Sequence, residues 1–282
     1  MKNGINLNKV AGWVLAFIGS LVLVMTVSLA IIKFTLFNEH YMLHVANKVE
    51  YSQNMAKEIN DTITDLGRGS SVPPKVLQHT VSKDLVQQDF ENYVTAIYSG
   101  QTFTAANQNV VANKVVESVK NYANEIGQTL DEDTVTNIDT LGKEAGKRYT
   151  SLIAIPYLSV YAQKVMAYNG HIWILLIITA GIFILLLLGG MSLASRLKHR
   201  KLRYLATIFN GAGLMLLVFP GYLYFSKLFY RLGISSKTLY DFLTTYVNGF
   251  IAMFLWAGLI SLIIGAGLFI WSEQKRKKLI HH

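Results

Sequence analysis

Four long apolar runs constrain this chain more than any other feature of its sequence. An α-helix rises 1.5 Å per residue, so about 20 apolar residues are needed to cross a hydrocarbon core of roughly 30 Å. Four runs reach that length, at residues 10–33, 171–195, 204–226 and 247–271. Only 15% of all residues are charged, whereas roughly 25% are charged in soluble domains. The sequence therefore predicts an integral membrane protein with four transmembrane helices.

The first run has a second interpretation, as a secretory signal peptide. Basic residues precede it, and SLA at residues 28–30 is an acceptable cleavage tripeptide. The apolar part of a signal peptide is usually about 7–15 residues long, but here the 23 residues from Val10 to Ile32 carry no charge. That length favours a transmembrane helix that is retained.

Basic residues mark the ends of these runs and predict their orientation, because lysine and arginine beside transmembrane helices concentrate on the cytoplasmic side. Lys2 and Lys9 precede the first run, and two clusters follow the second and fourth runs: Arg196, Lys198, Arg200, Lys201, Arg203, Lys275, Arg276, Lys277 and Lys278. We therefore expect a multi-pass protein of the cell membrane in which three segments are cytoplasmic, residues 1–9, 196–203 and 272–282. The net charge of +9 then indicates contact with anionic membrane lipids and not with nucleic acid.

On this topology, residues 34–170 and the loop 227–246 lie outside the membrane. Residues 34–170 hold 11 basic and 15 acidic residues, a net charge of −4. Apolar residues recur there every three or four positions, which is the spacing of one buried helix face, over residues 37–66, 82–100 and 105–126. A fourth helix is expected from about residue 130, with a kink at Pro156.

Local signals predict where these helices begin and end. Gly100 and Gly127 favour helix ends, and Ser82 is a suitable N-cap. Four amphipathic helices can bury one another as a bundle. The predicted fold class is an all-α integral membrane protein with four transmembrane helices and a large extracytoplasmic helical-bundle domain inserted between the first and second.

This order of a span, an external helical domain and a second span resembles the sensor half of bacterial chemoreceptors. The chain departs from that pattern on the cytoplasmic side, where the inner loops of about ten residues are too short for a kinase-coupling or catalytic domain. A signal transmitted inward would have to pass through the transmembrane helices to another protein.

Two patterns within the spans are candidates for helix packing and lipid contact. Small residues allow helices to approach closely in lipid, and six glycines lie near the inner ends of three spans: Gly189, Gly190, Gly211, Gly213, Gly265 and Gly267. At the outer end of the third span, Tyr222, Tyr224 and Phe225 are expected in an interfacial aromatic belt. A lipid-binding cleft open to the outer leaflet is the alternative for these aromatic residues.

The stretch FNEHYMLH, residues 37–44, is the candidate for metal or catalytic chemistry. His40 and His44 are four residues apart and therefore share a helix face, and His171 begins the second span on the same side. A transition-metal site needs a third ligand and supporting hydrogen bonds, but His40 lies about eight residues beyond the first span, too far for His171 unless the second helix is shifted or tilted. We expect ordinary interfacial histidines, with a metal site and a catalytic role as alternatives.

Other chemistry is poorly supported by the sequence. Cysteine is absent, which excludes disulfides, zinc–thiolate sites and cysteine nucleophiles. No Walker loop, GxSxG or HExxH motif is present, and no cofactor is expected. The central thirds of the spans contain no charged residue, although most ion paths do.

Two function classes follow. The first is a non-enzymatic membrane protein whose external helical domain binds a protein partner or envelope component, as an accessory or sensor subunit of a membrane complex. The alternative is a cell-envelope enzyme acting on lipid or lipid-linked substrate at the outer surface of the membrane. Histidines that converge on neighbouring helices beside a carboxylate would favour the enzyme.

Overall fold

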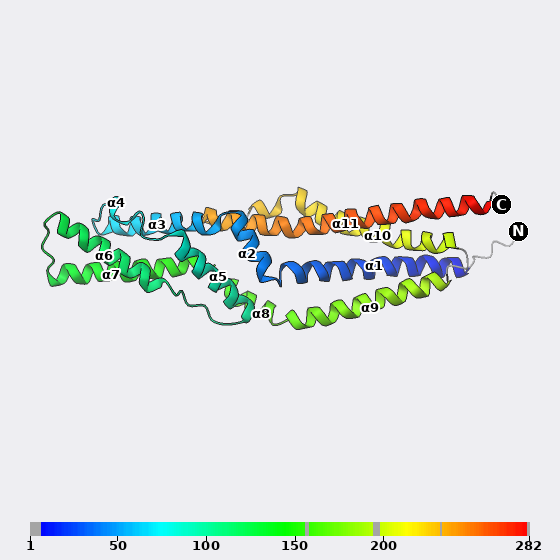
Figure 1. Cartoon of the computed structure of the whole chain (residues 1–282), viewed down its shortest axis with the longest axis horizontal. Helices are drawn as coiled ribbons and strands as arrows, with labels where there is room; N and C mark the ends of the chain where they lie inside the picture. The colour runs from blue at the N-terminus through cyan, green and yellow to red at the C-terminus, as the bar shows by residue number, and fades with distance from the viewer. Residues whose placement is uncertain (1–6, 156–157, 194–197, 232, 281–282) are drawn as a thin grey trace. The chain divides into compact units, whose positions relative to one another are not determined.

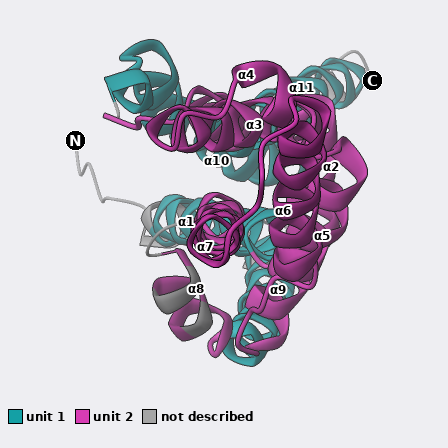
Figure 2. Cartoon of the chain, turned by 90° about the vertical axis from the view of Figure 1, so that its left-hand side faces the viewer, with its two compact units in different colours: residues 1–36, 169–231, 247–282 teal, residues 37–168, 232–246 magenta. Residues whose placement is uncertain are grey.

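The computed structural model describes residues 7–155, 158–193, 198–231 and 233–280. Across these residues the chain forms helices and no β-strand (Figure 1). The chain divides into two compact units (Figure 2). Unit 1 comprises residues 1–36, 169–231 and 247–282, and unit 2 comprises residues 37–168 and 232–246.

Unit 1 contains the long apolar helices. They are α1 (Leu7–Thr35), α9 (Asn169–Leu193), α10 (Lys198–Phe225) and the part of α11 (Lys237–Ile280) from residue 247 onward, together with the short 3-10 helix η1 (Leu228–Arg231). The candidate spans are Ala11–Thr35, Lys164–Ser192, Lys198–Arg231 and Lys237–Lys278. The prediction of four helices that are long and apolar enough to cross a membrane is confirmed.

Alanine, aliphatic and one tyrosine side chain form the buried cluster of unit 1. This cluster comprises Ala16, Leu23, Tyr204, Ile208 and Ala212, contributed by α1 and α10. The Ser20 hydroxyl on α1 donates to the Ile208 carbonyl at 3.1 Å, and the Tyr204 hydroxyl donates to the Leu186 carbonyl at 3.1 Å. Large apolar side chains such as Leu185 and Ile263 are exposed, which is the arrangement expected of helices surrounded by lipid tails.

Unit 2 is built from shorter, amphipathic helices. They are α2 (Glu39–Lys48), α3 (Tyr51–Gly69), α4 (Pro74–Leu77), α5 (Lys83–Ser99), α6 (Gln108–Glu125), α7 (Glu132–Ile153) and α8 (Leu158–Met166), joined by residues 237–246 of α11. Ser82 is the N-cap of α5, and Gly100 and Gly127 adopt left-handed backbone conformations after α5 and α6. The positions of these helix ends agree with the sequence prediction, although the Ser82 side chain makes no capping hydrogen bond among the described residues.

Two breaks differ from the sequence prediction. The single helix expected over residues 37–66 is divided between α2 and α3, because Glu50 takes the left-handed conformation with φ 52°. The side-chain amide of Asn54 then donates to the Val49 carbonyl at 3.2 Å. The fourth helix does not continue through a kink: α7 ends at Ile153, as expected ahead of a proline, although Pro156 itself lies outside the described residues.

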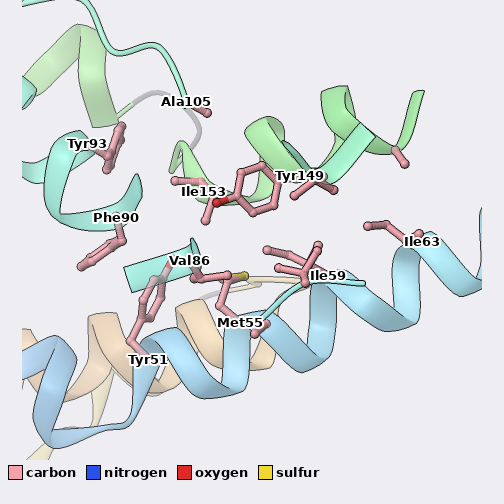
Figure 3. Packing of buried hydrophobic residues seen from close by; sticks show 14 of the residues in the cluster. Tyr51, Met55, Ile59, Ile63, Val86, Phe90, Tyr93, Ala105, Tyr149 and Ile153 are labelled. Carbon is pink, nitrogen blue, oxygen red and sulfur yellow. The ribbon is translucent and has the colours of Figure 1, made fainter. Parts of the chain in front are cut away.

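The core of unit 2 is made of large apolar and aromatic side chains. Figure 3 shows residues of α3, α5 and α7 meeting in this core; they include Tyr51, Met55, Ile59, Ile63, Val86, Phe90, Tyr93, Tyr149 and Ile153. Each is nearly or completely buried. Burial of a large apolar side chain contributes about 1.5–3 kcal/mol, so this core stabilises unit 2 by the hydrophobic effect.

The sequence predicts residues 237–246 as part of an external loop, but in the structure they form the first turns of α11. Phe242 is fully buried, with its ring 5.2 Å from the Tyr51 ring and 5.9 Å from the Phe90 ring. Tyr246, one turn later, packs against Tyr41 with the two ring centroids 5.3 Å apart. The segment is helical because its aromatic side chains at spacing four complete the core of unit 2.

Candidate functional site

A polar hollow of about 380 Å³ opens in unit 2 between α3 and the start of α11. We call it the α3/α11 groove; it is lined by Asn54, Lys57, Glu58, Asp61, Ser235, Lys237, Thr238 and Asp241. Its two walls come from segments that are far apart in the sequence. The groove therefore exists only when residues 235–241 pack against α3.

Hydrogen bonds fix the wall contributed by α11. The Ser236 hydroxyl oxygen accepts from the backbone amide of Leu239 at 3.1 Å, as an N-cap does. The same hydroxyl donates to Glu58 Oε2 at 3.0 Å, and Thr238 is buried. This bond holds the Glu58 carboxylate against the start of α11. The other charged side chains of the groove face solvent.

Charges of both signs line this groove. Lys57, Asp61, Lys237 and Asp241 are exposed, and within the described part of the chain none of these four forms an ion pair. By contrast Asp65, one turn beyond Asp61 on α3, pairs with Arg68 at 2.6 Å. The groove is thus a hydrated surface on which alternating charges are available to an incoming polar group.

A buried carboxylate organises another part of unit 2. Asp89 on α5 is fully buried and accepts hydrogen bonds from the backbone amides of Ala106 at 2.9 Å and Asn107 at 3.0 Å. It also accepts from the Tyr149 hydroxyl at 2.7 Å. Burial and then the hydrogen bond to Asp89 raise the pKa of Tyr149 above its ordinary value. Because every donor lies within the fold, this network holds the segment before α6 against α5 and α7.

Sequence reasoning missed Asp89, although a signal was present. Asp89 follows Val86 by three positions and precedes Tyr93 by four, so it lies on the buried stripe of α5 and not on the solvated face. An acidic residue in that position predicts a buried hydrogen-bonded carboxylate.

The Tyr51 hydroxyl is buried with no hydrogen-bond partner among the described residues. Burial raises the pKa of Tyr51, with smaller contributions from Tyr93 and Glu58. The ring is packed against Phe90 at 4.4 Å between centroids. Tyr51 therefore contributes mainly by packing, and its phenol is neutral in the core.

The histidine candidates lie at exposed positions. His40 and His44 are on α2, where the backbone amide of His40 donates to the capping Asn38 Oδ1 at 3.0 Å. His171 is exposed near the start of α9. Across the described ranges of the chain, no group of three His, Cys, Asp or Glu residues could hold a metal ion. Glu39, beside His40, instead accepts from the Thr95 hydroxyl at 2.5 Å.

Four of the six candidate packing glycines lie against another helix. A Cβ on Gly213 would lie 2.9 Å from the Gly258 carbonyl oxygen, and a Cβ on Gly258 would lie 3.0 Å from the Gly213 carbonyl oxygen. Gly190 lies against the Tyr204 ring, Gly211 lies against Ser20, and Gly265 lies against the Asn210 side chain. Gly189 and Gly267 face open space, so the close approach is specific to particular helix faces.

The aromatic and basic candidates are placed at the ends of the long helices. Tyr222, Tyr224 and Phe225 are exposed at the end of α10, where the rings of the last two meet edge to face at 5.6 Å. The basic residues with described side chains are exposed or half-buried: Lys198, Arg200, Lys201, Arg203, Lys275, Arg276, Lys277 and Lys278. Arg196 lies outside the described residues.

One acidic residue connects the two basic clusters. Glu273 lies 4.0 Å from Arg203 and 3.5 Å from Arg276. The Ser272 hydroxyl donates to the His199 carbonyl at 2.6 Å, and Arg203 lies over the Phe269 ring at 5.5 Å. These contacts join the start of α10 to the end of α11 in unit 1.

Comparison with known proteins adds no functional assignment: no family model, no curated protein and no solved structure matches this chain.

Proposed function

We propose that this chain is a non-enzymatic, multi-pass membrane protein that binds a protein partner through the α3/α11 groove, as an accessory or sensor subunit of a membrane complex. In this proposal the long helices of unit 1 cross the cell membrane with both termini in the cytoplasm. Unit 2 is the extracytoplasmic domain that meets the partner.

The distribution of charge supports this assignment of the two units. Sixteen of the 17 acidic residues belong to unit 2, and Glu273 is the one in unit 1. The basic residues after α9 and at the end of α11 are those that the positive-inside rule places in the cytoplasm. Unit 2 then lies on the opposite side, where its polar surface is hydrated.

The observation that carries the binding function is that four charged side chains of the groove form no ion pair with any other described residue. Lys57 and Asp61 on α3 stand across from Lys237 and Asp241 on α11. Even a formed ion pair at an exposed position contributes only about 0–1 kcal/mol to folding, so exposed charges without an ion pair add little to the stability of unit 2. Complementary charges do increase the rate and specificity of association, and a polypeptide offers both signs along one surface.

The enzyme alternative lacks a comparable observation. It required histidines that converge beside a carboxylate, and among the described residues His40, His44 and His171 do not join a group of three metal-capable residues. The buried carboxylate, Asp89, is surrounded by donors from its own fold.

Photo-crosslinking in native membranes tests the proposed function. A photoreactive amino acid placed at Lys57 or Asp241 is expected to give a defined adduct with another protein. The matched control is Asp65, which is exposed on α3 but is paired with Arg68. Absence of an adduct from both groove positions, or the same adducts from Asp65, would contradict the proposal.

A further inference from the structure

The short helix α8 has one apolar face that unit 2 leaves exposed. Tyr161 and Val165 are four residues apart on this helix, and Tyr168 follows three residues later. Their exposed fractions are 65%, 46% and 63%. The turn continues past the end of α8, because the Tyr168 amide donates to the Val165 carbonyl at 3.0 Å. Residues at spacings of four and three share one helix face.

The opposite side of α8 is fixed to unit 2. Ala162 is buried in the core, and Leu158 packs against the same core. Just before the helix, the Ile155 carbonyl accepts from the buried Tyr93 hydroxyl at 3.1 Å. Because these contacts set the rotation of α8 about its axis, the exposure of Tyr161 and Val165 is a property of the fold.

The exposed face of α8 lies at the start of a candidate membrane span. The candidate span that contains α9 begins at Lys164, within α8 itself. Five residues after Tyr168, Trp173 lies beneath Lys33 Nζ at 5.4 Å and meets Phe34 edge to face at 6.5 Å. Lys33 also donates to the Asn169 side chain. Tryptophan and lysine of this kind are typical of the headgroup level of a bilayer.

We propose that the face of α8 formed by Tyr161, Val165 and Tyr168 lies in the headgroup region of the bilayer, on the side of the membrane where α9 begins. Tyrosine suits this place, because its ring is apolar and its hydroxyl remains hydrated. The exposed Lys164 extends its amine to lipid phosphates. This contact makes α8 an interfacial anchor for unit 2. The inference rests on α9 crossing the membrane and does not depend on the partner of the α3/α11 groove.

The chain contains no cysteine, so one introduced cysteine gives one labelling site. Val165→Cys would carry a nitroxide spin label in the full-length protein, reconstituted in vesicles of phosphatidylethanolamine and phosphatidylglycerol. The matched control is Val110→Cys, since Val110 is a valine on α6 of unit 2 that is 41% exposed. Tyr161→Cys is a second test position on the same face of α8. Accessibility to oxygen, which concentrates in lipid, is compared with accessibility to a water-soluble nickel chelate.

We expect the labels at residues 161 and 165 to be accessible to oxygen but much less accessible to the nickel chelate than the label at residue 110. Equal nickel accessibility at residues 165 and 110 would overturn it, because this face of α8 would then be in water. Loss of both oxygen and nickel accessibility at residue 165 would also overturn it, because the face would then be packed against protein, such as a second copy of the chain. A crosslinking failure at Lys57 leaves these outcomes unchanged.

Discussion

The two units of this molecule differ in where their large apolar side chains lie. Unit 2 holds most of them in its interior, whereas unit 1 has many of them on its surface. In unit 2, Tyr51, Phe90 and Phe242 are buried. In unit 1, Leu185 and Ile263 are among the exposed large apolar residues, and the buried positions include the small residues Ala16, Ser20 and Ala212 together with the larger Tyr204, Ile208 and Leu216. The same class of side chain is therefore distributed in opposite ways in the two units.

The difference is the one expected if the long helices of unit 1 cross a membrane, as we propose, while unit 2 is in water. In water, removing apolar area from solvent stabilises the fold by roughly 25 cal/mol per Å², which favours a core of large side chains. Lipid tails are as apolar as leucine, so helices in a membrane associate by close packing and by hydrogen bonds. The reciprocal approach of Gly213 and Gly258, and the Ser20 hydroxyl on the Ile208 carbonyl, are contacts of that second kind.

Replacing Phe242 with alanine should give the largest effect, since it tests whether the start of α11 belongs to the core of unit 2. Deletion of a fully buried phenylalanine costs about 3–5 kcal/mol. We expect a loss of that size in the free energy of unfolding of unit 2, measured by circular dichroism of the detergent-solubilised protein. Phe225→Ala is the control, because Phe225 is 80% exposed. If the two substitutions had equal effects, residues 237–246 would not be part of the core of unit 2.

Asp89→Ala should destabilise unit 2 by roughly 3 kcal/mol, because a buried donor left without an acceptor costs about 1–3 kcal/mol and Asp89 serves three donors. Glu91→Ala, on the exposed face of the same helix, should change stability by less than about 0.5 kcal/mol. Chemical denaturation of both variants measures the difference. If Asp89→Ala were as mild as Glu91→Ala, the carboxylate would not organise the segment before α6.

Gly213→Leu tests the packing rule of unit 1. The new side chain would meet the Gly258 backbone, and overpacking of this kind costs about 1–3 kcal/mol. The folded fraction in detergent, followed by size-exclusion chromatography against temperature, should therefore fall. Gly267→Leu adds the same side chain where a Cβ meets open space, and we expect it to be tolerated. If both variants behaved alike, close approach of α10 and α11 would not stabilise unit 1.

Tyr149→Phe should have the smallest effect, about 1.5 kcal/mol, because it removes one hydrogen bond to a carboxylate that keeps its two backbone donors. The substitution also adds a pH signature. The pKa of Tyr149 is raised in the folded protein, so its contribution is fully present below the ordinary tyrosine pKa of about 10. As the pH rises above that value, the unfolded chain loses the proton first and the contribution declines. The gap in stability between Tyr149→Phe and the natural protein should therefore narrow between pH 9 and about 11; a gap that widens would contradict the assignment.

Much of this fold was accessible to sequence reasoning, and the failures have physical causes. Periodicity and glycine positions predicted the ends of α5 and α6, because a residue such as Gly100 marks a left-handed backbone position. The break at Glu50 carried no such signal, since neither glycine nor proline is present there. Phe242 was missed because its burial depends on α3 and α5, which are distant in the sequence. The groove was missed for the same reason, since its two walls are brought together by tertiary packing.

Thiol labelling from outside the cell tests most directly whether unit 1 is surrounded by lipid and unit 2 lies outside the cell membrane. Single cysteines at Ser70 in unit 2 and Ser192 at the end of α9, both exposed serines, can be treated with a membrane-impermeant thiol reagent in intact cells. We expect labelling of residue 70 in intact cells and labelling of residue 192 only after the cells are disrupted. Labelling of residue 192 in intact cells, or protection of residue 70 until disruption, would contradict it.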